Sequence, residues 1–270
     1  MTAPTDERHG RRPGSDGSAV RRNGWVAPVA FGVLVLLVWE GFVRLLGVPA
    51  FLLPAPTAIG AQIGSHLPVI LETAAVTGGN ALVGLVAGFL VGVLLALLAS
   101  ASRLVAELTT PVVLAGSAVP IVALAPVFTT MFGSTTEIPR RLVVTVVVIV
   151  PVFVSTVRGL RAVAPVHADL MTSLAATPAQ FARFVRVPGA MPYIITGLRL
   201  AAPAAVIASI VAEYFGGLQN GLGSRITSAA ANTAYARAWA FVAASIVLGL
   251  LFYLAGLLAE RLATRGRTTT

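Results

Sequence analysis

Long apolar segments separated by short polar ones fill this chain after residue 23. About 20 apolar residues cross the hydrocarbon core of a bilayer as a helix. We predict spans at 25–46, 73–101, 108–133, 142–157, 193–215 and 238–259. Prolines interrupt 48–56, which leads into a short interfacial segment ending near His66. The pattern therefore predicts an all-α polytopic membrane bundle of about six transmembrane helices.

The segment 142–157 is rich in β-branched residues, which also suit a buried strand. Pro151 disfavours a central strand, and a lone strand in lipid leaves its backbone hydrogen-bonding groups unsatisfied, so we expect a helix. Its sixteen residues rise only about 24 Å, which is short of a core of about 30 Å. We therefore expect Arg140, Arg141 and Arg158 to reach the lipid headgroups from both ends.

The composition excludes a soluble domain, because 57% of the residues are hydrophobic and 11% are charged, against about 25% charged in soluble domains. The net charge is +9, but the arginines lie at the borders of apolar segments and form no patch with interleaved aromatics. We therefore expect no nucleic-acid partner. Cysteine is absent and the three histidines are scattered, so we expect no disulfide, metal site or cofactor.

Arginine counts predict the orientation of the spans. If the N-terminus is cytoplasmic, thirteen arginines lie inside and five outside, as the positive-inside rule favours; the pair Arg140 and Arg141 is the exception. We predict this organisation: a disordered cytoplasmic tail at 1–23, a first span with the interfacial segment at 24–66, a core at 67–262 with a cytoplasmic loop at 160–190, and a cytoplasmic tail at 263–270.

Several residues inside the spans stand out. Gly84, Gly88 and Gly92 share one helix face, where small residues let another helix approach, either in ordinary packing or in a special role. Asn80 lies one step earlier on that face and could hydrogen-bond to a neighbouring helix. Glu213 is a charge within or near the fifth span, where it needs a partner or water.

Glu213 is our first candidate for a pathway residue, and Asn80 is the second. Arg199 lies on the same span about 21 Å from Glu213, so the two do not pair. Pro120 and Pro126 bend or break the third span, either to line a pathway or as packing kinks. An acidic lining would suit a cationic or neutral heterocycle better than an anion.

The polar segment 169–188 lies between the fourth and fifth spans. Its sequence around Thr177 and Pro178 is a helix-start signal with a capping box to Gln180. We predict two short helices, at 166–176 and 178–187. The second places Phe181, Phe184 and Val185 on one face, flanked by Arg183 and Arg186. Such a helix either lies on lipid headgroups or docks on a protein, and the residues alone leave both open.

This segment resembles the cytoplasmic loop of permease subunits of bacterial ATP-binding-cassette (ABC) importers, whose pattern is Glu-Ala-Ala, three residues, Gly, nine residues and Ile-x-Leu-Pro. The matching positions here are Asp169, Leu170, Met171, Ala175, Val185, Val187 and Pro188. Only Pro188 is identical, and alanine replaces the glycine. The resemblance extends over about 50–262, where LLPAPTAI, AEYFGG and NGLGSRI look like the nitrate, taurine and sulfonate branch, which includes relatives for pyrimidine-type vitamin precursors.

The resemblance implies a type I ABC importer permease fold in the bacterial inner membrane. It implies a second permease subunit, as a homodimer, and an extracytoplasmic solute-binding protein. It also implies cytoplasmic ATPase subunits that contact the loop, including Thr177, Pro178, Phe181, Arg183 and Phe184. The chain has no GxxxxGK[ST] phosphate loop, so we expect a non-catalytic subunit. The alternative is an ion-gradient-driven secondary carrier or channel, which would use polar residues at the midplane.

Overall fold

The computed structural model describes residues 26–116 and 118–264, and every regular element in these ranges is helical. In chain order they are α1 (Val26–Leu45), α2 (Pro56–Ala101), α3 (Arg103–Gly116), α4 (Ile121–Phe132), α5 (Ile138–Arg161), α6 (Pro165–Ser173), α7 (Pro178–Phe181), the π-helix η1 (Ala182–Arg186), α8 (Val187–Tyr214), α9 (Leu222–Ala231) and α10 (Tyr235–Thr264). The all-α prediction is therefore confirmed.

The described chain forms two units, one ending at Pro56 and the other beginning at Thr57. The first contains α1, an apolar helix of 20 residues that matches the first predicted span. The predicted boundary between the segment 24–66 and the permease core at 67–262 stays a prediction. The predicted tail at 1–23 and most of that at 263–270 lie outside the described residues.

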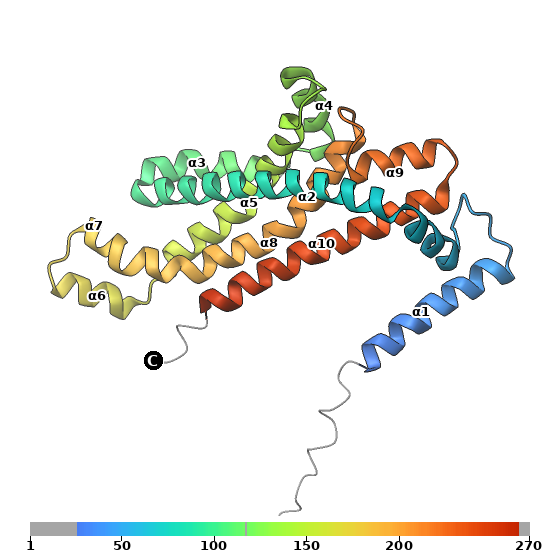
Figure 1. The fold of residues 1–270 in the computed structure, drawn as a ribbon. Helices are drawn as coiled ribbons and strands as arrows, with labels where there is room; N and C mark the ends of the chain where they lie inside the picture. The colour runs from blue at the N-terminus through green and yellow to red at the C-terminus, as the bar shows by residue number, and fades with distance from the viewer. Residues whose placement is uncertain (1–25, 117, 265–270) are drawn as a thin grey trace, which may run out of the picture. The chain divides into compact units, whose positions relative to one another are not determined.

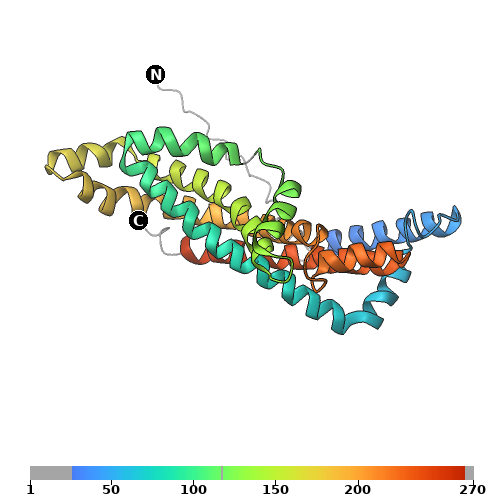
Figure 2. The same cartoon turned by 90° about the horizontal axis from the view of Figure 1, so that it is seen from above.

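Long helices form the body of the second unit (Figure 1). Helix α8 packs most extensively against α5 and next against α10. Figures 1 and 2 show α6 and α7 at one end of this bundle and α9 at the other. The α6–α7 segment connects the end of α5 to the start of α8, the two helices that pack most extensively.

Two of the predicted spans contain kinks or breaks close to prolines. The interfacial segment and the second span form one helix, α2, with a non-helical residue at His66, two residues before Pro68. The predicted break in the third span is confirmed, because α3 and α4 are separate helices that meet at 98° just before Pro120. Pro120 stands at the N-cap of α4 and lacks the N–H that would continue a helix, whereas Pro126 lies inside α4 without ending it. With this bent pair the structure offers up to six membrane-spanning elements, and five without it.

The fourth span is longer than expected. Helix α5 has 24 residues and rises about 36 Å, so it needs no extension by arginine to cross the bilayer. The expectation that Arg140 reaches the headgroups is wrong, because its side chain is buried, only 3% exposed. The predicted span began at residue 142, after Arg140 and Arg141, whereas α5 begins at Ile138 and includes both arginines. Folding instead supplies Arg140 with half-buried polar partners, Glu137 and Asn220.

Small residues let α2 and α5 approach closely. A Cβ atom added at Gly84 would lie 2.4 Å from the Val144 Cβ, and one at Gly88 would lie 2.7 Å from the Thr145 carbonyl oxygen. Gly92 is similarly close to Ile149. The glycine face predicted from the sequence is thus a packing surface within one chain. Valines of α5 and alanines of α8 complete the same buried core.

Candidate functional site

The segment between α5 and α8 begins with α6, which ends in a tight turn. The Ala176 N–H donates to the Met171 carbonyl, and the Ala175 N–H donates to the Thr172 carbonyl, each at 3.0 Å. This pair of bonds is a Schellman motif, whose central residue adopts the left-handed conformation. Ala175 does so with φ of +49°. Alanine thus occupies the backbone conformation for which the resembled loop pattern uses glycine.

We expect Ala175→Gly to stabilise the turn by about 1 kcal/mol, because the left-handed conformation costs an L-residue about 1–2 kcal/mol and glycine almost nothing. Hydrogen exchange of the amides at 170–180 measures the effect, which appears as slower exchange. Ala176→Gly is the matched control, since Ala176 has no positive φ. It should speed exchange, and a gain at both positions would contradict the explanation.

The second part of the segment begins at the predicted capping box. The Thr177 N–H donates to Gln180 Oε1 at 2.8 Å, and the Gln180 N–H donates to Thr177 Oγ1 at 3.3 Å. The helix then continues through η1 into α8, so the predicted end at residue 187 is wrong. The π-helix η1 ends at Arg186, two residues before Pro188, which lacks an N–H to donate to the helical ladder.

The side chains of this segment are divided between exposed and internal positions. Leu170, Leu174 and Phe184 are 54–66% exposed, so apolar surface faces outward. Arg183 lies 5.8 Å from the centre of the Phe184 ring, and Arg186 lies 4.8 Å from that of Phe181, within the range of cation–π attraction. The other residues predicted to contact an ATPase subunit fall into two groups. The exposed residues are Asp169, Ala175, Thr177 and Pro178, and the half-buried residues are Met171, Val185, Val187 and Pro188.

A buried polar cluster closes the opposite end of the bundle around Glu213 of α8. Its carboxylate accepts hydrogen bonds from the Thr77 hydroxyl at 2.9 and 3.2 Å and from the Gly223 N–H at 2.7 Å. The Thr77 hydroxyl oxygen accepts from the Leu222 N–H at 2.9 Å, and Ser209 donates to the Thr77 carbonyl. Glu213 is 1% exposed. It therefore fastens the start of α9 to α2 and α8.

Two glycines make this contact possible. A Cβ atom at Gly221 would lie 2.3 Å from the Glu213 carboxyl carbon, and one at Gly223 would lie 2.4 Å from the Ile210 carbonyl oxygen. The NGLG sequence at 220–223 thus brings the Gly223 N–H against a buried carboxylate. This pairing of AEYFGG with NGLGSRI was not anticipated from the sequence, although both segments stood out in it.

A second polar group lies at the start of α5. The Glu137 carboxylate accepts from Asn80, Arg140 and Asn220, each at 2.8 Å, and Arg140 also donates to the Asn220 side-chain oxygen. Arg141 donates to the Asn80 side-chain oxygen at 3.0 Å. The prediction that Asn80 hydrogen-bonds across helices is confirmed. Glu137 was missed, although its position four residues after Gly133 and beside two arginines was a usable signal.

The pKa of Glu137 provides a pH test of this group. Burial raises it, but the hydrogen bond from Asn220 and the charge of Arg140 outweigh burial and hold the pKa below its ordinary value of 4.5. A carboxylate whose pKa is depressed in the folded state stabilises the fold at pH values above its unfolded-state pKa. This stabilisation is lost as the pH falls through the folded-state pKa. We expect the difference in melting temperature between wild type and Glu137→Gln to be constant near neutral pH and to shrink below about 4.5. A difference independent of pH would contradict this.

Arg199 finds its partner on another helix. It donates to Glu260 of α10 at 2.5 Å, and Glu260 also accepts from Thr196 at 2.8 Å. Gly256 permits the approach, because a Cβ atom there would lie 3.0 Å from the Arg199 Cα. The prediction that Arg199 and Glu213 do not pair is confirmed: Glu213 is partnered in the last turn of α8, and Arg199 is partnered near the middle of this helix.

The predicted pathway residues occupy different surroundings. Pro120 lies at the bend before α4, and Pro126 lies within α4. Other residues of α4, Ile121 and Leu124, line an apolar cavity of about 260 Å³ together with residues of α3, α5 and α8. Glu213 and Asn80 instead are hydrogen-bonded within the two polar groups at the α9 end. A contact of any of the four with solute stays a prediction.

Comparisons with known proteins give this arrangement its family. The family of binding-protein-dependent transport system inner membrane components matches residues 88–267. The chain belongs to this family. It is 32% identical over 205 residues to the formylaminopyrimidine transport permease protein ThiX of Halalkalibacterium halodurans, covering 73% of this chain and 78% of that protein. It is 26% identical over 238 residues to the putative aliphatic sulfonates transport permease protein SsuC of Bacillus subtilis, covering 83% of each.

The fold comparison agrees. An amino acid ABC transporter chain superposes with a TM-score of 0.63 and 17% identity, covering 74% of this permease and 96% of that chain. The type I ABC importer permease fold expected from the sequence is therefore confirmed. The protein is an inner membrane permease subunit of an ABC importer for a small solute, and the family is one of transport subunits.

Proposed function

We propose that the segment from α6 to η1 is the surface by which this permease contacts a separate cytoplasmic ATPase subunit. Its outward-facing leucines and Phe184 support this, because exposed apolar side chains in a projecting segment are typical of a protein-binding surface. The segment is joined directly to α5 and α8, which form the most extensive helix pair. Movement of the ATPase would thereby shift two core helices together.

We extend the proposal to the rest of the assembly, and membership of the family supports it. A second copy of the permease completes the pathway, and an extracytoplasmic solute-binding protein delivers the solute near α9. Both termini lie in the cytoplasm. ATP hydrolysis belongs to the ATPase subunit. The apolar lining of the cavity beside α4 supports an uncharged ring, such as a pyrimidine-type vitamin precursor, over nitrate, taurine or another sulfonate, because a buried anion needs a cationic partner.

Co-purification with the ATPase subunit tests the docking surface. We expect the double variant Leu170→Ala and Phe184→Ala to weaken the complex at least tenfold, since buried interface anchors contribute 2 kcal/mol or more each. Phe215→Ala is the matched control, because Phe215 is also exposed but lies at the other end of α8. Undiminished binding by the double variant would contradict the proposal.

Cysteine labelling tests the orientation independently. The chain has no native cysteine, so each introduced one is a unique reporter. Ser173 at the end of α6 and Ser228 on α9 are both exposed. We expect an impermeant thiol reagent outside the cell to label Ser228→Cys but not Ser173→Cys. The reverse pattern would place the α6 end outside and overturn the assignment.

A further inference from the structure

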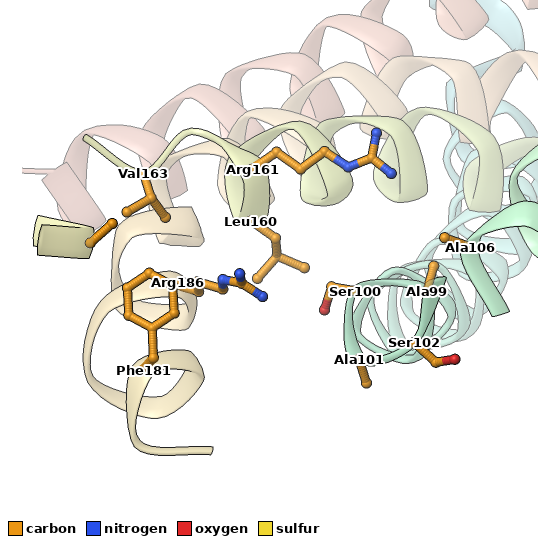
Figure 3. Close-up of a pocket in the computed structure, with 11 residues that line it drawn as sticks. Ala99, Ser100, Ala101, Ser102, Ala106, Leu160, Arg161, Val163, Phe181 and Arg186 are labelled. Atoms are coloured by element: carbon orange, nitrogen blue, oxygen red, sulfur yellow. The ribbon is translucent and has the colours of Figure 1, made fainter. Parts of the chain in front are cut away.

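We call the segment from α6 to η1, residues Pro165–Arg186, the coupling segment. Two cavities adjoin at the end of the bundle that carries it. The larger, about 510 Å³, lies between the ends of α2 and α5 and the segment from α6 to η1 (Figure 3). The smaller, about 400 Å³, lies between α3 and α5. Arg161, at the last position of α5, lines both. They therefore form neighbouring parts of one recess around this arginine.

The recess has a basic head. Arg186 lines the larger cavity and Arg158 the smaller, in addition to Arg161. Figure 3 shows the Arg186 side chain extending toward Ser100, at the end of α2. Within residues 26–116 and 118–264, none of the three arginines has an acidic partner, and no acidic side chain lines either cavity. Three positive charges thus face a hollow without a counter-charge from the described chain.

The smaller cavity continues from this head along an apolar wall. Leu114 of α3 and Phe153, Val154 and Val157 of α5 line it. The eight helical steps from Phe153 to Arg161 rise about 12 Å along α5. Leu114 and Val154 are 46% and 42% exposed. The recess is therefore cationic at the helix ends and apolar toward the middle of the membrane span.

We propose that an anionic phospholipid occupies this recess, with its phosphate beside Arg161 and between Arg158 and Arg186, and an acyl chain along α5. Charge complementarity and the apolar continuation both favour a lipid, since basic pockets between membrane helices at the headgroup level bind anionic lipids. Because Arg186 belongs to η1, the lipid joins the coupling segment to α2 and α5. The site rests on membrane insertion alone and goes beyond the docking surface proposed above.

Native mass spectrometry of the full-length chain tests the site with phosphatidylglycerol and phosphatidylcholine as probes. We expect preferential retention of phosphatidylglycerol. Arg161→Gln should weaken it about fivefold, and the triple variant with Arg158→Gln and Arg186→Gln by more than tenfold. Arg183→Gln and Arg225→Gln are controls of equal charge change, because neither arginine lines the recess. Melting temperatures of all variants without lipid separate loss of binding from loss of fold.

Three results would overturn the proposal. One is equal retention of both lipids, or retention unchanged in the triple variant. A second is full displacement by inorganic phosphate, which would indicate a free-anion site. A third is disulfide formation between copies carrying Val154→Cys, which would make the groove a subunit contact. Since lipid retention is measured without the ATPase subunit, and docking on that subunit with it, either proposal can fail alone.

Discussion

Replacing Glu213 with alanine should release α9 from the bundle and lower the free energy of unfolding by about 2–6 kcal/mol. The substitution removes the acceptor of the Thr77 hydroxyl and of the Gly223 N–H, both in buried surroundings. A buried donor left without a partner costs about 1–3 kcal/mol, and two donors are affected. Hydrogen exchange over 218–234 should accelerate, whereas exchange in α5 should change much less.

The conservative variant Glu213→Gln is the control for this prediction. Its amide oxygen can still accept from Gly223, so it should lose less stability than the alanine variant. Gly223→Ala should resemble Glu213→Ala, because its Cβ would lie 2.4 Å from a backbone carbonyl of α8 that cannot rotate away. If Glu213→Ala leaves α9 protected from exchange, the carboxylate does not hold this helix.

The contact of Glu213 with the start of α9 is relevant to transport, because α9 lies at the end of the bundle opposite the coupling segment (Figures 1 and 2). Helix α8 links the two directly: η1 continues into its first turn, and Glu213 is in its last. In the proposed coupling, a displacement applied at one end would reach α9 through α8 and the buried Glu213 group. This connection gives the proposed coupling a defined route through the fold.

Local signals in the sequence predicted much of this fold. Apolar length located α1 and the cores of α2, α5, α8 and α10, and the Thr177 capping box located the start of α7. These features depend on residues close together in the chain, so spacing and side-chain chemistry suffice. The glycine face on α2 was likewise readable, because a period of four places small residues on one side of any helix.

Hydrogen-bond partners far apart in the sequence could not be predicted. The buried position of Arg140 depends on Asn220, 80 residues away, and that of Glu213 depends on Thr77, 136 residues away. Without these partners the charges looked like span borders or pathway residues. The recess around Arg161 could not be predicted either. It is lined by residues of α2, α3, α5 and η1, which only the fold brings together.

Gly88→Ala should separate α2 from α5 and destabilise the protein by about 1–3 kcal/mol, the usual cost of overpacking a filled core. The added methyl would lie 2.7 Å from both the Thr145 carbonyl oxygen and the Val148 Cβ, and neither atom can move without its helix. Gly84→Ala meets the same obstacle at Val144. The melting temperature in detergent measures the loss, which should grow in the double variant.

Gly79→Ala on the same helix separates packing from helix propensity, because no atom lies within 4 Å of its Cβ position. It should stabilise α2 by up to about 1 kcal/mol, since alanine favours helix over glycine. Opposite signs at Gly79 and Gly88 would show that close helix approach, not backbone freedom, explains the glycines facing α5. Stability changes in the same direction at both positions would refute this explanation. Because α5 also carries Arg161 and leads into the coupling segment, a shifted α2–α5 contact should weaken ATPase binding as well as stability.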